Sequence, residues 1–275
     1  MDLSMQALVL GIVQGLTEFL PISSSGHLIV VPYLLGWNDP FIDSLAFSVM
    51  LHMGTLVALL AYFWRDWLRL VPAGLAAIRD RSLTDDPDRR LAWLLVVTAI
   101  PGAIVGVLLN DFIEQHVRLA GSVAVLLVIG AVILYVADRT RPRLRAMTDL
   151  SFAAALGIGL AQAVALFPGI SRSGISISAA RFLGLDRENA ARFSFLMATP
   201  IIAGAGLFEA RKMIGADSGL AGHTGLIAIG FAAALASGLV AIAAMLRFLR
   251  TNSLTAFVVY RIVLAAVVLV VFLSR

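Results

Sequence analysis

Six long apolar stretches constrain the fold of this chain more than any other feature. Each has about the 20 residues that a helix needs to cross a hydrocarbon core about 30 Å thick. Lipid offers the backbone no hydrogen-bond partners, so such stretches fold as transmembrane helices. The composition, 60% hydrophobic and 14% charged, excludes an ordinary soluble domain and indicates an all-α polytopic membrane protein. The six predicted spans lie near 43–63, 91–110, 119–137, 193–210, 226–248 and 254–273.

Two further apolar segments, at about 5–36 and 151–184, are interrupted midway by proline and by serine and glycine. Such an interruption frees backbone groups, which are tolerated at membrane depth only against protein or a water-filled cavity. We therefore predict two re-entrant helix-loop-helix hairpins. If both segments crossed the membrane fully, each half would have four spans and the repeats would be parallel.

The interrupted segments contain two copies of one sequence. Residues 11–26 and 159–174 align without gaps and share Gly, Gln, Phe, Ile, two Ser and a closing Gly. Each half then holds one hairpin and three spans. Because three is odd, the second half is predicted to insert upside down, as in inverted-repeat transporters. The chain is thus predicted to be one membrane domain, 1–275, with repeats at about 1–137 and 149–275.

The two copies differ at positions that carry chemistry. Glu18 aligns with Leu166, and Ser24 aligns with Arg172. Unlike polar residues on a duplicated scaffold predict one composite site that is built from both halves.

Basic residues predict the orientation. Fifteen Arg lie in 64–90, 138–150, 181–192 and 247–253, whereas the opposite loops carry only Arg118, Arg211, Lys212 and Arg275. The positive-inside rule places the first set in the cytoplasm and both termini outside. The same rule explains the net charge of +4, so that binding to nucleic acid is not needed to account for it.

Residues 67–78 indicate an interfacial amphipathic helix, and residues 79–90 indicate a solvated loop. No basic residue precedes Arg65, so we expect no signal peptide and residues 1–40 in the mature protein.

Gln14 and Glu18 are four residues apart and project from one face of a helix. An ionised carboxylate in an apolar run costs several kcal/mol unless it is paired or bound to a metal. Glu18 could therefore pair with Arg172 or Arg261 for structural reasons, or it could form a hard-cation or proton site. Oxygen ligands suit Mg²⁺ or Ca²⁺, whereas zinc is disfavoured because the chain has no Cys.

Serine and glycine follow the break in both hairpins. Small hydroxyl residues at a helix start expose free N–H groups and the positive end of the helix dipole, which together bind anions. The second copy adds the guanidinium of Arg172, which suits bidentate phosphate recognition. Ordinary N-capping is the alternative. The predicted phosphate-binding residues are Ser23, Ser25, Gly26, Ser171, Arg172, Ser173, Gly174 and Ser176.

The remaining polar residues of the apolar sequence have weaker patterns. His27 lies three residues after Ser24 and could share its site, although a lone His is often a hydrogen-bonded core residue. His52, within a span, is interpreted as structural or as a partner of a site residue, and His116 and His223 as loop residues. Arg261 lies too deep to snorkel and is predicted to pair with a carboxylate or to line the cavity.

Two motifs resemble those of the bacitracin-resistance type of undecaprenyl-diphosphatase, an integral membrane family that removes one phosphate from a polyprenyl carrier lipid. They are residues 14–27, QGLTEFLPISSSGH, and residues 168–176, PGISRSGIS. Length and span pattern agree over essentially the whole chain. Gln14 stands where the family accepts Glu or Gln, and Ser176 stands where Thr is usual.

This resemblance implies a hydrolase of the bacterial cytoplasmic (inner) membrane that depends on Mg²⁺ or Ca²⁺. Its site would open toward the outer, periplasmic side, and its substrate would be a polyprenyl diphosphate. It also implies roles in peptidoglycan synthesis and in bacitracin resistance.

We hypothesise that Arg172 and nearby N–H groups bind phosphate and that Glu18 and Gln14 hold the cation. Ser24 would be the nucleophile, and His27 would be the base or the acid. The alternative nucleophile is water activated by His27 or Glu18.

The expected partners are the bilayer and the lipid substrate, without nucleic acid. The run Gly204-Ala205-Gly206 permits close helix packing and a homodimer. A lipid-phosphate flippase or secondary transporter is the main rival function, because inverted repeats also build carriers. A purely structural membrane protein is the third option.

Overall fold

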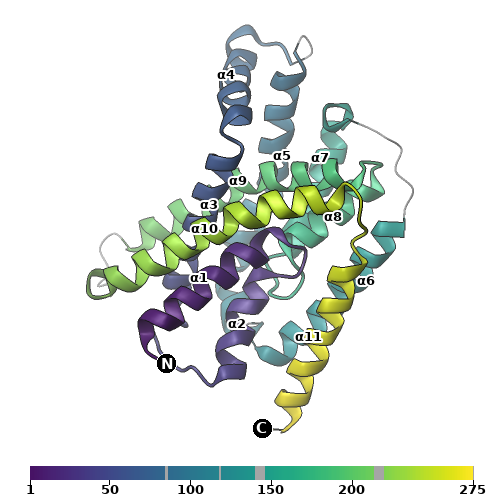
Figure 1. The fold of residues 1–275 in the computed structure, drawn as a ribbon. Coiled ribbons are helices and arrows are strands. Elements are labelled where there is room, and N and C mark those ends of the chain that lie inside the picture. Colours follow the sequence, from purple (N-terminus) through teal and green to yellow (C-terminus); the bar gives the residue numbers. More distant parts are fainter. Residues whose placement is uncertain (84–85, 118, 140–145, 214–219, 275) are drawn as a thin grey trace.

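A computed structural model describes residues 1–83, 86–117, 119–139, 146–213 and 220–274. In these residues all regular structure is helical (Figure 1). Arg118, Arg141, Arg143, Arg145 and Arg275, which entered the orientation argument, lie outside them. The elements are α1 (Leu3–Phe19), α2 (Ser24–Leu35), α3 (Leu45–Tyr62), α4 (Trp64–Asp80), α5 (Pro87–His116), α6 (Ala120–Arg139), η1 (Met147–Asp149), α7 (Phe152–Val164), α8 (Arg172–Phe182), α9 (Arg187–Met213), η2 (Leu220–His223), α10 (Thr224–Leu249) and α11 (Thr255–Ser274).

Six of the described helices are long and apolar enough to cross a membrane. They are α3, residues Pro87–Leu109 of α5, α6, residues Arg187–Phe208 of α9, α10 and α11. Large apolar side chains such as Leu108, Leu207 and Leu273 are exposed on them, as expected where lipid replaces water. The predicted all-α polytopic class and its six spans are therefore confirmed.

Each interrupted segment is a pair of short helices joined by a turn. α1 ends at Phe19 and α2 begins at Ser24, with Pro21, which lacks a backbone N–H, in the turn between them and Ser23 as the N-cap of α2. α7 ends at Val164 and α8 begins at Arg172. α2, α7 and α8 have 12, 13 and 11 residues, fewer than the roughly 20 that a membrane span needs. Re-entrant insertion and opposite orientation of the two pairs remain predictions.

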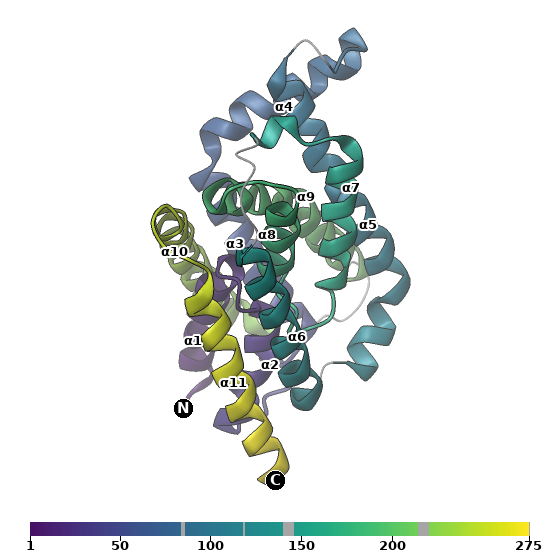
Figure 2. The ribbon, with the colours of Figure 1, turned by 90° about the vertical axis from the view of Figure 1, so that its right-hand side faces the viewer.

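The two copies pack in corresponding ways. α1 lies against α10 and α7 lies against α5, while α6 and α11 run side by side in both Figure 1 and Figure 2. A Cβ atom at Gly11 would lie 2.3 Å from the carbonyl oxygen of Gly230, and one at Gly159 would lie 2.6 Å from that of Thr98. Both approaches of backbone to backbone therefore require the duplicated glycine. This correspondence supports the proposal of two repeats.

The largest buried cluster contains the end of α1 together with side chains of most of the later helices, including α3, α5, α9 and α10. Phe19, the last residue of α1, packs edge-on against Phe195 of α9 with ring centroids 5.4 Å apart. The end of the first interrupted helix is thus anchored against a span of the other half.

The predicted amphipathic helix at 67–78 is α4, which projects with the start of α5 at the top of Figures 1 and 2. Trp93 Nε1 donates to the carbonyl oxygen of Gly74, 3.2 Å away, and so ties α5 to α4. The outer face of α4 exposes Leu68, Val71, Leu75 and Ile78. The predicted loop 79–90 is shorter than expected, because α4 continues to Asp80 and α5 begins at Pro87. Residues 84–85 lie outside the described part.

Candidate active site

The two serine bends, residues 18–26 and 166–174, share one local geometry. Ser23 and Ser171 have φ of 76° and 74°, in a region that residues other than glycine rarely adopt. Each serine Oγ accepts a hydrogen bond from a glycine N–H three residues on, Gly26 at 3.3 Å and Gly174 at 3.1 Å. Both serines are therefore N-caps.

The bends also bind each other. The Gly169 N–H donates to Ser23 Oγ at 3.0 Å, and Ser173 Oγ donates to the Leu20 carbonyl at 2.9 Å. Residues separated by about half the chain are therefore held in direct contact.

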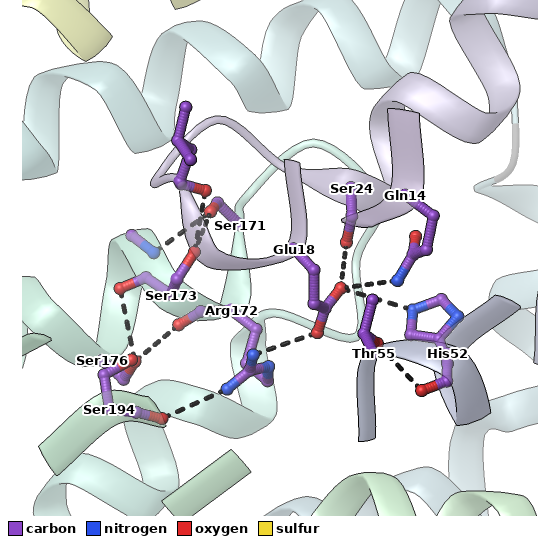
Figure 3. Close-up of polar contacts among 12 residues, drawn as sticks. Gln14, Glu18, Ser24, His52, Thr55, Ser171, Arg172, Ser173, Ser176 and Ser194 are labelled. Carbon is purple, nitrogen blue, oxygen red and sulfur yellow. Dashed lines mark hydrogen bonds and ion pairs between the residues drawn. The ribbon is translucent and has the colours of Figure 1, made fainter. Parts of the chain in front are cut away.

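Glu18 lies at the centre of the contacts in Figure 3. Its carboxylate is buried, and Oε2 accepts from Ser24 Oγ at 2.5 Å and from Gln14 Nε2 at 3.0 Å. Oε1 accepts from Arg172 Nη2 of the second bend at 3.0 Å. The carboxylate of one bend and the guanidinium of the other thus form an ion pair inside the protein.

Arg172 has donors left over. Nη1 donates to the carbonyl oxygen of Ser194 at 3.3 Å, and the buried Nε has no hydrogen-bond partner. Ser194 Oγ in turn lies 2.6 Å from Ser176 Oγ. Nη1 and Nη2 each carry two N–H groups and each donates one hydrogen bond, to Ser194 and to Glu18, so an anion that approached Arg172 could accept from the second N–H of either.

His52 lies beside Glu18 at the site. Its Nδ1 lies 2.8 Å from the Ser48 carbonyl, which can only accept, so Nδ1 carries a hydrogen. The other nitrogen, Nε2, then faces Glu18 Oε2 at 3.6 Å. The interpretation of His52 as a partner of a site residue agrees with this position.

A cavity of about 280 Å³ opens beside these groups. Its polar wall combines residues of both bends with two from α3, namely Glu18, Ser24, Ser25, Ser48, His52 and Arg172. Its remaining wall is mainly apolar and comes from α2, α3, α9 and the second bend, with Ile29, Val49, Met53, Leu166, Ile201 and Ile202. A charged head with an apolar tail would match this division of the cavity.

His27 lies elsewhere. Its Nδ1 is 2.7 Å from the Ser23 carbonyl, and its Nε2 is 2.7 Å from the hydroxyl of Tyr260. Both ring nitrogens are therefore occupied outside the residues that line the cavity. The sequence predicted a site shared with Ser24. Instead, His27 lies three residues further along α2, and its ring points toward α11. The other two histidines end helical elements, His116 in α5 and His223 in η2, rather than lying in loops.

Arg261 corrects a second expectation. The sequence predicted that it would pair with a carboxylate or line the cavity. Instead its guanidinium is fully buried, does not line the cavity, and donates to the carbonyl oxygens of Pro21, Leu127, Gly169 and Ile170.

The predicted phosphate-binding residues separate into two groups. Ser25 and Arg172 line the cavity. The others are buried and take part in capping, packing or contacts between elements, namely Ser23, Gly26, Ser171, Ser173, Gly174 and Ser176. The bends therefore contain both the capping and the site features that were weighed as alternatives.

Glu18 and Gln14 are the residues that could supply oxygen ligands to a divalent cation. Mg²⁺ commonly uses one or two carboxylates together with substrate phosphates. The buried Oε1 of Gln14 has no hydrogen-bond partner, and exchanging the amide nitrogen and oxygen would turn it toward Glu18. In the described part of the chain no three His, Cys, Asp or Glu cluster together, so substrate oxygens would have to complete the coordination.

Comparison with known proteins matches nearly the whole chain to one family. The family described as bacitracin resistance protein BacA matches residues 7–267. A protein named undecaprenyl-diphosphatase from Desulforudis audaxviator is 46% identical over 270 residues, 98% of each chain. A protein of the same name from Thermomicrobium roseum is 45% identical, and the match covers 97% of each chain. Another, from Pelotomaculum thermopropionicum, is 43% identical, and the match covers 98% of this chain and 97% of the relative.

Proposed function

The chain belongs to the bacitracin resistance protein BacA family, and we propose that it hydrolyses undecaprenyl diphosphate to undecaprenyl phosphate and inorganic phosphate. The reaction returns the lipid carrier to cell-wall synthesis and gives resistance to bacitracin. The observation that carries the proposal is the convergence of Ser24, Glu18 and Arg172 from two bends on one cavity. These groups supply a nucleophile, a base and a phosphate ligand.

Ser24 attacks in the mechanism that this geometry supports best. Its hydroxyl already donates to Glu18, so the carboxylate can take the proton while Oγ bonds to the terminal phosphorus. The bond from that phosphorus to the bridging oxygen breaks, and undecaprenyl phosphate leaves with the electron pair. Water then attacks the phosphoserine, the bond from phosphorus to Oγ breaks, Glu18 returns its proton to Oγ, and inorganic phosphate leaves as H₂PO₄⁻ with both protons of the water.

The leaving group explains why a separate acid is not required. Undecaprenyl phosphate departs as a phosphate monoester, whose second pKa is about 6, so it is stable as an anion near neutral pH. His27, which contacts Ser23 and Tyr260 instead of Ser24, is therefore proposed to hold the first bend in place.

Arg172 is proposed to bind the terminal phosphate. Charge on the phosphoryl oxygens must be neutralised as the phosphorus passes through its transition state. Arg172 lines the cavity with N–H groups of Nη1 and Nη2 beyond those that bind Ser194 and Glu18, and Ser25 adds a hydroxyl to the same wall. When bound, a Mg²⁺ or Ca²⁺ ion held by Glu18 and Gln14 would neutralise further phosphoryl charge.

The apolar wall is proposed to receive the first part of the prenyl tail. Ile29, Val49, Ile201 and Ile202 form that wall next to the charged groups, and burial of apolar surface there would favour binding.

In the run Gly204-Ala205-Gly206, which was predicted to permit a homodimer, Gly206 packs against Met53 of the same chain. A homodimer stays a prediction.

Phosphate release from undecaprenyl diphosphate by purified protein in detergent tests this function. We expect release that falls to background with a chelator and returns when Mg²⁺ or Ca²⁺ is added in excess, because cation and diphosphate share the site. Undecaprenyl phosphate, which lacks the anhydride, is the matched control substrate and should release none. Full activity in chelator would contradict the metal proposal alone, whereas transport without phosphate release would favour a carrier.

We further propose that the protein lies in the inner membrane with its site open to the periplasm. The chain has no cysteine, so single cysteines can report topology without a background. Asn38→Cys and Thr251→Cys lie at exposed positions in loops that the arginine distribution places outside and inside. An impermeant maleimide should label the first in sealed right-side-out vesicles and the second only after permeabilisation. The reverse pattern would overturn the orientation.

A further inference from the structure

We propose that Tyr260 and Arg261, neighbours on α11, are positioning residues that hold the two serine bends at the separation that catalysis needs. The proposal rests on the phosphatase function above. Neither residue lines the cavity, so both would act through the bends.

Arg261 bonds to both bends at once. Its Nη1 donates to the carbonyl oxygen of Pro21 in the first bend at 3.1 Å. Its Nη2 donates to the carbonyl oxygens of Gly169 and Ile170 in the second bend at 2.8 and 3.0 Å. Its Nε donates to the Leu127 carbonyl in α6 at 3.1 Å. One planar group thus ties three separate segments together.

These contacts stabilise both the buried charge of Arg261 and the carbonyl groups at the helix breaks. The side chain of Arg261 is 0% exposed, and a buried charge is costly unless it is compensated. Breaks in helices leave carbonyl groups without their usual partners, and at membrane depth water cannot replace them. The guanidinium supplies the missing donors, and the carbonyl dipoles stabilise its charge. An apolar residue of similar volume would satisfy neither group.

Tyr260 fixes the first bend through a short chain of hydrogen bonds. The Ser23 carbonyl only accepts, so His27 Nδ1 carries the hydrogen between them at 2.7 Å. His27 Nε2 then accepts from the Tyr260 hydroxyl, also at 2.7 Å, and the two rings stack with centroids 5.7 Å apart. Ser23, at the end of this chain, has the strained φ of 76°.

Ser23, the N-cap in the first bend, connects these hydrogen bonds to the second bend. Gly169 N–H donates to Ser23 Oγ, so the residue held by His27 also holds the second bend. Ser24 follows Ser23 directly, and Arg172 lies in the second bend, where it begins α8. Movement of either bend would therefore change the separation of nucleophile and phosphate ligand, and a misplacement of about 1 Å can cost about 100-fold in rate.

Tyr260→Phe tests the proposal because it removes one hydroxyl and leaves the ring. We expect kcat to fall about 10-fold or more, with KM changed less than about threefold and an unaltered thermal midpoint. Tyr135→Phe is the matched control, since Tyr135 is 41% exposed against 43% for Tyr260 and contacts Arg139 through its ring. It should keep the wild-type kcat. A lower midpoint with unchanged turnover per folded molecule would mean a structural role only and would overturn the proposal.

A double-mutant cycle asks whether Tyr260 acts through His27. The variant with both Tyr260→Phe and His27→Ala should be no slower than His27→Ala alone, because the second change removes the same connection. Fully multiplicative losses would overturn the connection. Arg261→Lys, which keeps the charge but loses the planar fork, should also lower kcat with little effect on KM.

Amide hydrogen exchange measures positioning without turnover. On substrate-free protein, peptides covering residues 20–27 and 165–175 should exchange faster in Tyr260→Phe and Arg261→Lys than in wild type or Tyr135→Phe. Unchanged exchange in both bends would overturn the positioning role. If the wild type released no phosphate while this exchange difference remained, the phosphatase proposal would fail and the structural connection would stand.

Discussion

Replacement of Arg172 by alanine is expected to lower kcat/KM for undecaprenyl diphosphate by about 10³-fold or more. Arg172 lies in the cavity with unused donors, where it can bind the oxygens of the transferred phosphoryl group. Removal of one preorganised donor costs roughly 10² to 10³ in rate, and an arginine at a phosphoryl group roughly 10³ to 10⁵. Initial rates of phosphate release measure the loss.

Stability must be separated from chemistry in this variant. Arg172 is the cation hydrogen-bonded to buried Glu18, and removal of one member of a buried ion pair costs about 3–5 kcal/mol. Glu18→Gln combined with Arg172→Ala removes both charges and should regain thermal stability but no activity. Arg172→Lys should be intermediate in rate, because it keeps the charge without the fork. Unchanged turnover in Arg172→Ala would remove the phosphate ligand from the mechanism.

Ser24→Ala is expected to reduce kcat at least about 10³-fold, because loss of a nucleophile removes the covalent route. In the wild type, acid quenching during turnover should trap phosphate on Ser24, which mass spectrometry can detect. A Ser24→Ala protein with near-normal hydrolysis would eliminate the covalent route and leave water, activated by Glu18, as the nucleophile.

Ser25→Ala is the matched control for this variant. Ser25 also lines the cavity, but its nearest described polar contact is Ser23 Oγ at 3.5 Å, whereas Ser24 contacts Glu18. Its loss should therefore cost about 10-fold at most, the value of one neutral hydrogen bond to substrate. An equal loss in both serine variants would mean that the two hydroxyls bind phosphate and that neither is the nucleophile.

The elements of the fold were predictable because the physics that sets them is local. A helix needs a certain apolar length to cross lipid, so six spans could be read directly from hydropathy. Pro21 and Pro168 marked the breaks together with the serine and glycine that follow them, since proline lacks one N–H of the helical ladder and serine favours an N-cap. The pairing of Glu18 with Arg172 could also be anticipated. Buried charges require partners, and the alignment of the two copies predicted that their polar residues form one site.

Other contacts were not predictable from the sequence, for a physical reason. His52 reaches Glu18 from α3, and the packing that brings them together leaves no pattern in spacing. His27 lies near Ser24 in sequence, but its direction depends on the positive φ of Ser23 and on Tyr260. Arg261 binds backbone carbonyls, and every residue carries one, so its partners have no residue type to search for.

The unlike residues at matching positions of the two bends have a consequence for any ancestor made of two identical chains. Two copies of the first bend would bring a pair of carboxylates to the pocket with no guanidinium, because Ser24 occupies the position of Arg172. Two copies of the second bend would bring a pair of guanidinium groups with no carboxylate, because Leu166 occupies the position of Glu18. Neither symmetric pairing balances its charge in the low dielectric of the bilayer. Only unlike halves in one chain place a single carboxylate opposite a single guanidinium at this pocket.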